Sequence, residues 1–365
     1  MASTKVAVLE QCRVGPQPTD EPELLEKPLP LTFFDVPWLS LPPVKHLLFY
    51  EFPQSKRYTS LTPSTAHKYV LSSCAATAAV SNVDDTVVVP LLAVQFTLFP
   101  DAGMCVGFTM HHITGDASAL INFIASFASL TKFGGEANKL LPPFLDRKVI
   151  GDRNGLEEIL WKQIGDIKYV ETPYIHKVRA TFVITKSDVE KLKKAVLGLR
   201  PTLSYASTFT VACAYVWICF AKLRAKCAKE LDERAENFFW TAECRSRLDP
   251  PVPANYFGNC LIPFFATAKT SKLVMGDGLA TAAEMIGEAI RKKLHEGEDV
   301  LKGFENWMVD FGRIKANEEP VVSVVGSPKF SFYDSEGGYM EIGLSFPELE
   351  MDAFATIFSD GLESL

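Results

Sequence analysis

The stretch from residue 87 to residue 133 constrains the fold most, because its hydrophobic pattern changes period once. A run of strand-forming residues is followed by a turn near Gly103 and by alternating apolar residues up to Met110. Apolar residues then recur at helical spacing over 120–127. The pattern predicts a buried hairpin that leads into a helix, with Asp116 in the N-cap position.

The chain of 365 residues is too long for one core, and 47% of it is hydrophobic, so two domains are expected. Periodicity is weak between residues 134 and 176, where prolines and glycines are frequent. We therefore predict an N-terminal lobe over 1–150, a crossover connection over 151–177 and a C-terminal lobe over 178–365. Strands and helices are mixed in both halves without an internal repeat, which predicts two α/β lobes.

Local patterns predict further elements. The aromatic segment LTFFDVPWL at 31–39 is typical of an early edge strand and turn. In the second half we expect, in order, a strand over 179–185, a helix from a capping box at 187–190 to Gly198, a long apolar helix over 207–229, an amphipathic helix over 279–294, strands over 321–333 and 339–346, and a last helix.

Composition excludes several kinds of partner. Lys and Arg number 37 against 44 Asp and Glu, a net charge of −7, which offers no general attraction to nucleic acid or to an anionic membrane. The eight cysteines form no C-x-x-C pair, so we expect reduced thiols. The first residues lack a signal-peptide core, and the apolar stretches over 87–100 and 211–221 are shorter than the ~18 residues of a membrane span. We expect a cytoplasmic monomer that binds small molecules.

The strongest chemical signal is the segment FTMHHITGDAS at 108–118. A histidine at the end of a strand, followed by a glycine turn, can project its imidazole into a cleft, where a near-neutral pKa suits a general base. His112 is the candidate, and Asp116 follows four residues later. By spacing alone the alternative stays open that His112 makes a core hydrogen bond and that Asp116 only caps the helix.

Metal binding is less well supported by the sequence. His111 and His112 are adjacent on a strand and should point to opposite faces, and no further His or Cys cluster completes a ligand set. We therefore expect no metal site. The chain has no G-x-S-x-G elbow, P-loop or dinucleotide-binding glycine motif in the required strand–helix context, and DFG at 310–312 lacks the other kinase motifs.

Several segments match one family in the same order. They are LTFFDVPWL, HHITGD, STFTVACAYVW at 207–217, ECRSRLDPPVPANYFGNC at 243–260 and VVGSPKF at 324–330. This set resembles the BAHD plant acyltransferases, whose H-x-x-x-D motif corresponds here to His112 and Asp116. YFGNC is similar to the branch that malonylates anthocyanins and other phenolic glucosides.

The resemblance implies a fold and a reaction. The fold would be a two-domain, chloramphenicol-acetyltransferase-like α/β fold with a channel between the lobes. The reaction would be transfer of malonyl from the co-substrate malonyl-CoA to the glucosyl 6-hydroxyl of an anthocyanin, flavonoid or phenolic glucoside, with no permanently bound cofactor. His112 would be the general base, and Asp116 would support the loop by pairing with an arginine, for which Arg245 is the candidate.

The same resemblance implies further site residues. LPPFLDRKVI at 141–150 is similar to the segment that carries the malonyl-binding arginine, which implies this role for Arg147, and a guanidinium fork suits a carboxylate. The alternative is a solvated loop arginine paired with Asp146. Weaker candidates for contacts with the CoA moiety are Ser207, Thr208 and Ser327.

The sequence departs from the family pattern at two places. The DFGWG segment that relatives carry after the GSPKF-like strand is absent, and the DFG at 310–312 lies before that strand, in the wrong order. A second block is also missing after Leu61, where relatives have a longer stretch that contains a helix. A catalytically silent homologue is therefore one alternative to the malonyltransferase, and a relative that uses another acyl-CoA donor is a second.

Overall fold

The structure is a computed structural model, and the chain in it divides into two compact units. The first unit contains Met1–Glu157 and Pro253–Asn259, and the second contains Glu158–Gly165, Glu171–Val252 and Cys260–Leu365. A segment from the second half of the sequence therefore returns to the first unit. The structure describes residues 7–12, 29–51, 81–83, 86–88, 91–99, 103–133, 141–164, 177–203, 206–227, 233–294, 299–326 and 340–365.

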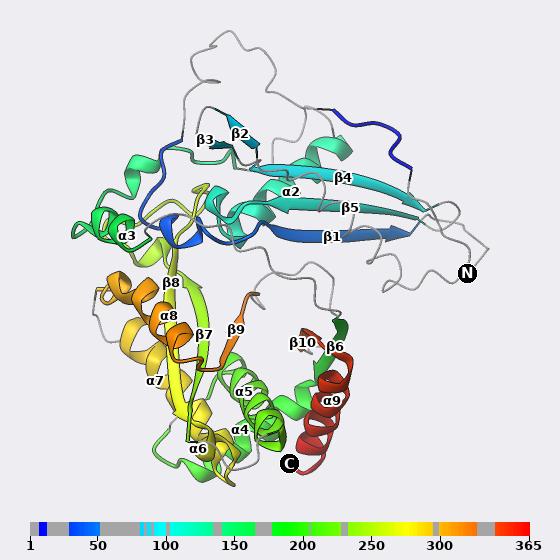
Figure 1. Cartoon of the computed structure of the whole chain (residues 1–365), viewed down its shortest axis with the longest axis vertical. Coiled ribbons are helices and arrows are strands. Elements are labelled where there is room, and N and C mark those ends of the chain that lie inside the picture. Colours follow the sequence, from blue (N-terminus) through cyan, green and yellow to red (C-terminus); the bar gives the residue numbers. More distant parts are fainter. Residues whose placement is uncertain are drawn as a thin grey trace. The chain divides into compact units, whose positions relative to one another are not determined.

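The first unit is built on an antiparallel sheet with the strand order β1-β5-β4 (Figure 1). Its strands are β1 (Val44–Glu51), β4 (Leu92–Phe99) and β5 (Gly103–Met110). Helix α2 (Ala117–Phe133) packs on the central strand through edge-to-face contacts of Phe108 with Phe123 and Phe127. The predicted hairpin of β4 and β5 and the helix that follows it are confirmed.

β4 is not the buried strand that the sequence predicts. Its side chains alternate between exposed and half-buried positions. The exposed ones are Leu92, Val94, Phe96 and Leu98. Helix α2 packs mainly against the central strand β5, so β4, at the edge of the described sheet, receives less cover. A short hairpin of β2 (Ser81–Val83) and β3 (Thr86–Val88) precedes it.

The aromatic segment near the start forms a turn and the 3-10 helix η2 (Val36–Trp38), and not an edge strand as expected from the sequence. Asp35 accepts hydrogen bonds from the backbone nitrogen and the hydroxyl of Thr32, at 2.8 and 2.9 Å. Such local side-chain bonding competes with strand pairing. The turn brings the Asp35 carboxylate into the interior of the unit, where it is fully buried.

The second unit contains a three-stranded sheet with the order β8-β7-β9 (Figure 1). β7 (Ala235–Glu243) pairs antiparallel with β8 (Leu261–Lys269) and parallel with β9 (Val321–Val324). β9 covers the first part of the predicted strand over 321–333, whose later residues lie outside the described part of the chain. The helices packed nearby are α5 (Thr208–Cys227), α6 (Thr270–Val274), α7 (Gly278–Leu294) and α8 (Trp307–Ala316).

A second antiparallel pair in this unit joins β6 (Val178–Ile184) to β10 (Met340–Phe346). α4 (Lys186–Leu199) follows β6 and begins with a capping box, but its N-cap is Thr185 and not a residue of the predicted box at 187–190. The extended backbone at the end of β6 lets the Thr185 hydroxyl accept from the backbone nitrogen of Asp188 at 3.2 Å.

Helix α5 forms the core of the second unit. It is the one helix of the described part of the chain that is long and apolar enough to cross a membrane, over Thr208–Lys226. The expectation that no apolar stretch reaches this length is wrong for α5. However, 61% of its most apolar window is buried, including Trp217, so its hydropathy is explained by packing inside the unit.

The last helix, α9 (Glu348–Glu363), packs a row of aromatic rings against β6, β10 and α5. Phe354 lies at the centre of this cluster and is fully buried. Its ring centroid lies 5.1 to 6.0 Å from those of Phe182, Phe220, Phe346 and Phe358. Further described helices are α3 (Leu156–Ile164) and the 3-10 turns η7 (Arg245–Arg247) and η8 (Phe304–Asn306).

Phe354→Ala should destabilise the second unit by about 3–5 kcal/mol, because it removes a buried ring and leaves a cavity. Urea unfolding followed by circular dichroism measures the loss. Leu349→Ala, in the same helix but 85% exposed, is the matched control and should change stability by less than about 0.5 kcal/mol. Equal effects of the two substitutions would contradict the packing described here.

Candidate active site

The site lies in the first unit, where β5 ends and the 3-10 turn η4 (His112–Thr114) begins. His111 is fully buried, and its Nδ1 accepts a hydrogen bond from the backbone nitrogen of Ile113 at 3.3 Å. Its own backbone nitrogen donates to the carbonyl of Leu91 at 2.9 Å. His111 therefore stabilises the turn through these two hydrogen bonds. The ring of His112 makes other contacts, with Trp38 and Asn259.

The His112 ring is fixed by two contacts. It stacks on the indole of Trp38, with ring centroids 3.8 Å apart and planes 7° from parallel. Its Nδ1 lies 3.1 Å from Oδ1 of Asn259, a residue of the segment that returns to the first unit from the second half of the sequence. The stacking sets the plane of the imidazole, and the hydrogen bond sets its rotation.

The tautomer of His112 follows from the surroundings of Asn259. The amide nitrogen of Asn259 donates both its hydrogens, to Oδ1 of Asp35 at 2.8 Å and to the backbone carbonyl of His112 at 2.7 Å. The amide oxygen must therefore face His112, and an oxygen can only accept. The proton of the neutral imidazole consequently resides on Nδ1, and Nε2 carries the lone pair that a general base needs.

Asp35 connects this hydrogen bond to an arginine. Its Oδ2 accepts from Nη1 of Arg147 at 2.9 Å, and the two side chains are 0% and 3% exposed. Burial raises the pKa of Asp35, while the charge of Arg147 and the hydrogen bonds from Asn259 and Thr32 act in the opposite direction. Arg147 also donates to the backbone carbonyl of Thr114 at 3.0 Å, so it supports η4 directly.

The surroundings of Arg147 differ from both sequence expectations. The side chain is buried, so it is not a solvated loop residue, and Asp146 instead caps the 3-10 turn η6 (Arg147–Val149) by accepting from the backbone nitrogen of Lys148. Nor does the guanidinium present an open fork to a malonyl carboxylate, because its Nη1 donates to Asp35 and its Nη2 donates to the carbonyl of Thr114.

Asp116 caps helix α2, as its position predicts. Its Oδ1 accepts from the backbone nitrogen of Ala119 at 3.1 Å, and its side chain is buried. The predicted partner, Arg245, belongs to the second unit, where its Nη1 lies 3.3 Å from the carboxylate of Glu243. Pairing between Asp116 and Arg245 stays a prediction.

Two glycines allow the chain segments at the site to approach closely. A Cβ atom on Gly115 would lie 2.7 Å from the Cβ of Ala119, and one on Gly258 would lie 2.6 Å from the hydroxyl of Tyr256. Both distances are shorter than carbon and oxygen atoms tolerate. Gly258 in addition accepts, through its carbonyl, a bond from the backbone nitrogen of Asp116 at 3.4 Å. Each glycine therefore allows close packing within its own segment, and the hydrogen bond from Asp116 to Gly258 joins the two motifs.

The electrostatic setting keeps His112 neutral. Burial lowers the pKa of His112 below the usual 6.5, and this effect exceeds the opposing effects of a hydrogen bond to its own carbonyl, of the Asp116 charge and of Asn259. The imidazole is therefore unprotonated at pH 7 and can accept a proton. Among the described residues, no three His, Cys, Asp or Glu side chains gather in a way that could hold a metal ion.

Comparison with known proteins decides the family. A family model described as "Transferase family" matches residues 60–341, which is more than half of the chain. The chain belongs to this family, the BAHD acyltransferases. The resemblance seen in the sequence motifs is thereby confirmed, and this chain is an acyltransferase by family.

Two curated relatives and one solved structure illustrate the likeness. Phenolic glucoside malonyltransferase 1 of Nicotiana tabacum is 34% identical, over 91% of this chain and 87% of its own. Malonyl-coenzyme A:anthocyanin 3-O-glucoside-6''-O-malonyltransferase of Dahlia pinnata is 30% identical, over 98% of both chains. The crystal structure of vinorine synthase matches 93% of each chain with a TM-score of 0.60 at 15% identity, which confirms the predicted fold class.

The relatives contain internal segments that this BAHD acyltransferase lacks. The alignment with the dahlia enzyme extends over 459 positions, more than the 365 residues of this chain, although it covers 98% of both proteins. The additional positions must therefore lie inside the alignment. This agrees with the sequence analysis, in which two blocks of the family pattern are absent.

The predicted CoA-contacting residues belong to the second unit or lie outside the described residues. The Ser207 hydroxyl accepts from the backbone nitrogen of Thr210 at 3.0 Å and so caps α5, whose first residue is Thr208. Ser327 lies outside the described residues. Contacts of these three residues with CoA stay predictions for the BAHD acyltransferase.

Sequence reasoning missed three residues of the site: Asp35, Trp38 and Asn259. Asp35 is the one charged residue of the aromatic segment LTFFDVPWL, and a carboxylate among core aromatics requires a buried partner. Asn259 lies in YFGNC, which the sequence analysis used only as a family signature. The carboxylate of Asp35 within an aromatic core segment was therefore the feature of the sequence that indicated a buried polar site.

In a titration of the folded protein by NMR, the ring of His112 should show a midpoint below 6.5, since burial disfavours the imidazolium form. Lowering the pH through that midpoint should abolish the free Nε2 lone pair. The same resonance in the urea-unfolded chain, expected near 6.5, provides the reference. A folded-state midpoint above the unfolded one would contradict the assigned environment.

Proposed function

We propose that this acyltransferase moves a malonyl group from malonyl-CoA to the glucosyl 6-hydroxyl of an anthocyanin, flavonoid or phenolic glucoside, with His112 as the general base. The observation that carries the base assignment is the hydrogen bond of His112 Nδ1 to the fixed amide of Asn259. The names of the tobacco and dahlia relatives support the donor and the acceptor class.

The chemistry requires no covalent acyl-enzyme, because the thioester already carries a good leaving group. Nε2 of His112 removes the proton of the acceptor hydroxyl as its oxygen attacks the thioester carbonyl. The tetrahedral intermediate then collapses, the carbon–sulfur bond breaks, and the proton held by His112 passes to the CoA sulfur. The products are the malonyl ester and free CoA, and His112 returns to its neutral form.

In this proposal Arg147 is a positioning residue. It holds Asp35, which holds the amide of Asn259, which in turn holds the His112 ring. Its second contact, to the carbonyl of Thr114, fixes the turn that carries His112. In this proposal the malonyl carboxylate is not the partner of Arg147, because Nη1 already donates to Asp35 and Nη2 to the carbonyl of Thr114.

Replacing His112 should abolish most of the transfer. His112→Ala should lower kcat by at least ~10²-fold, the usual contribution of a general base. Mass spectrometry after incubation with malonyl-CoA and a panel of phenolic glucosides measures the malonylated product. His112→Gln, which keeps an amide donor for Asn259 but has no base, should lose as much. An unchanged rate in either variant would remove His112 from the mechanism.

Arg147→Lys distinguishes positioning from recognition of malonyl. Lysine keeps the positive charge but lacks the two Nη groups that bind Asp35 and Thr114, so the hydrogen bonds that position His112 should weaken. As a result, kcat should fall about tenfold with malonyl-CoA and with acetyl-CoA alike. The ratio of kcat/KM for the two donors is the readout. A loss confined to malonyl-CoA would assign Arg147 to the malonyl carboxylate.

A second candidate function is a catalytically silent binding protein. The internal segments present in the relatives and absent here favour it, since a shortened chain can keep its pockets and lose turnover. The wild-type protein in the mass-spectrometric assay separates the two. Product that disappears with His112→Ala supports the transferase, whereas binding of malonyl-CoA by folded wild-type protein without any product supports the silent homologue.

A further inference from the structure

The contact between Trp38 and His112 differs from the usual packing of two neutral rings. Neutral aromatic pairs prefer offset or edge-to-face arrangements, with ring centroids roughly 4.5–7 Å apart. The contacts of Phe108 with Phe123 and Phe127 follow this preference, with planes 87° and 85° apart. Trp38 and His112 instead lie face to face, with centroids 3.8 Å apart and planes 7° from parallel. The imidazole therefore overlaps the face of the indole directly.

This overlap affects the two protonation states of His112 differently. The face of an indole ring carries negative charge from its π electrons and attracts a cation that lies over it. Neutral imidazole gains little from this attraction, whereas imidazolium carries a full positive charge spread over the ring that contacts Trp38. The contact therefore favours the protonated form. It acts against burial, which lowers the pKa of His112.

The backbone of η2 holds Trp38 in this position. The nitrogen of Trp38 donates to the carbonyl of Asp35 at 3.1 Å, and its carbonyl accepts from the nitrogen of Leu41 at 3.2 Å. Pro37 restricts the backbone of the same turn. The Trp38 residue is 8% exposed. Because cation–π contacts are stronger where water is excluded, this burial increases the effect of the indole on a charged ring.

Two titratable groups close to His112 in the sequence also act on its proton. The charge of Asp116 favours protonation of His112, while its carboxylate caps α2 by accepting from the nitrogen of Ala119. A protonated His112 lowers the pKa of His111, so the two histidines repel each other when both are charged. Neither group lies on the face of the His112 ring as Trp38 does.

The buried ion pair acts on His112 from a greater distance. The charge of Asp35 also favours protonation, but this carboxylate is paired with Arg147 and reaches the imidazole only through the amide of Asn259. The partner of Nδ1 is thus a neutral group. The π face of Trp38 is the contact of the ring that responds directly to its charge.

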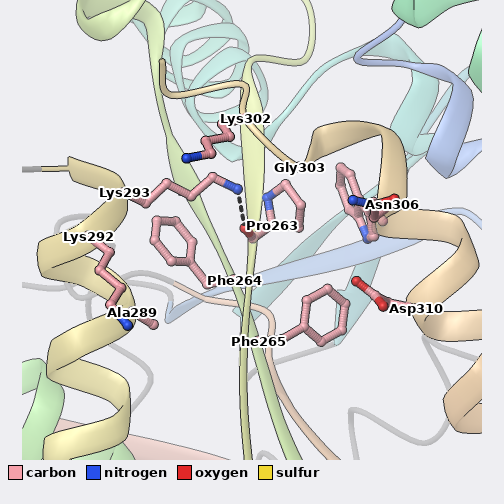
Figure 2. Close-up of a pocket in the computed structure, with 11 residues that line it drawn as sticks. Pro263, Phe264, Phe265, Ala289, Lys292, Lys293, Lys302, Gly303, Asn306 and Asp310 are labelled. Atoms are coloured by element: carbon pink, nitrogen blue, oxygen red, sulfur yellow. Dashed lines mark hydrogen bonds between the residues drawn. The ribbon is translucent and has the colours of Figure 1, made fainter. Parts of the chain in front are cut away.

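The second unit contains a cation–π contact with a charge of a different kind. At the wall of a cavity, the ammonium of Lys293 lies 5.4 Å from the ring centroid of Phe264 and donates to the carbonyl of Pro263 at 3.0 Å (Figure 2). An ammonium is charged in the resting protein. The charge over Trp38, in contrast, arises only when His112 takes up a proton.

We propose that Trp38 is a positioning residue whose indole face stabilises His112 as imidazolium while it takes up the proton of the acceptor hydroxyl. The proposal rests on the proposed function, because Trp38 acts through His112 as the general base. Charge develops on His112 between the ground state and the transition state. The contact is therefore stronger in the transition state, which is the condition for a faster reaction.

The test compares Trp38→Leu with wild type in the NMR titration of the His112 ring. Leucine keeps apolar cover but has no π face, so the midpoint should fall by about one pH unit below that of wild type. If Trp38 only excluded water, its replacement by the smaller leucine would instead move the midpoint up towards 6.5. A midpoint that rises or stays unchanged overturns the proposal.

Two further variants control for loss of packing. Trp38→Phe keeps a smaller π face and should give a midpoint between those of wild type and Trp38→Leu. Phe123→Leu removes a ring of the same unit that contacts Phe108, and it should leave the His112 midpoint unchanged. Circular dichroism shows whether each variant is folded. Equal shifts in Trp38→Leu and Phe123→Leu would count against a role of the indole face.

Fluorinated tryptophan tests the same contact without a substitution, and so applies even where Trp38→Leu does not fold. Fluorine is little larger than hydrogen and withdraws electrons from the ring face. In protein made with mono-, di- and trifluorotryptophan, the His112 midpoint should fall stepwise. The chain has five tryptophans, so the same series in Trp38→Phe, where the midpoint should not move, is the control. A midpoint that does not respond to fluorine contradicts the proposal.

Turnover gives a second readout. In Trp38→Leu the plateau of kcat should fall about threefold to tenfold, because a weaker base transfers the proton more slowly. The acid limb of the pH profile of kcat should move to lower pH by the same amount as the NMR midpoint. A purely structural role of Trp38 would lower the plateau without moving the limb in this direction, and that result would overturn the proposal.

Failure of this proposal and failure of the proposed function give different results. Wild-type protein that forms no malonylated product but shows the fluorine-dependent midpoint contradicts the proposed function alone, and the contact of Trp38 with the imidazolium stands. Wild-type protein that forms product while the midpoint does not respond to Trp38→Leu or to fluorine contradicts the role of Trp38 alone.

Discussion

The ion pair of Arg147 with Asp35 is the interaction on which the geometry of the first unit's site depends. Both charges are removed from water, which costs several kcal/mol per ion unless each finds good partners. Asp35 receives hydrogen bonds from Thr32, Asn259 and Arg147, and Arg147 adds the carbonyl of Thr114. The ion pair therefore has its hydrogen-bond partners only when the segments that contain Thr32, Thr114 and Asn259 have all folded around it.

This dependence has a chemical consequence for His112. A carboxylate bonded directly to Nδ1 would stabilise the imidazolium and raise its pKa, but here a neutral amide stands between the ring and Asp35. The amide fixes the tautomer without adding a full charge at the ring. If His112 is the base, as proposed above, its lowered pKa lets it give the proton back readily, which suits the proposed transfer of that proton to the sulfur of the leaving group.

Local patterns predicted the parts of the fold that depend on neighbours in sequence. The change of period before Leu120 predicted the hairpin and α2, and the position of Asp116 predicted its cap. The burial of a strand and the partner of a buried charge were not predictable in this way, because both depend on residues far away in the sequence. Among the described residues β4 is an edge strand with alternate side chains exposed, and Arg147 pairs with a carboxylate 112 residues away.

The site residues show the same division. His112 could be named from its turn, since a histidine after a strand is a local feature. Asn259 could not be given its role, because it lies 147 positions after His112 in the chain. The YFGN motif indicated that the segment is typical of the family, but only the fold shows that the amide of Asn259 sets the tautomer of His112.

The return of Pro253–Asn259 to the first unit also bears on the order of folding during synthesis. At roughly 5–20 residues per second, Asn259 leaves the ribosome about 7 to 30 s after His112. Until then the emerging first unit contains the ion pair of Arg147 and Asp35 but not the Asn259 amide that donates to Asp35, and Glu171–Val252 of the second unit has already been made. The first unit is therefore N-terminal in sequence, yet its His112 site is completed late, after Glu171–Val252 of the second unit has been translated.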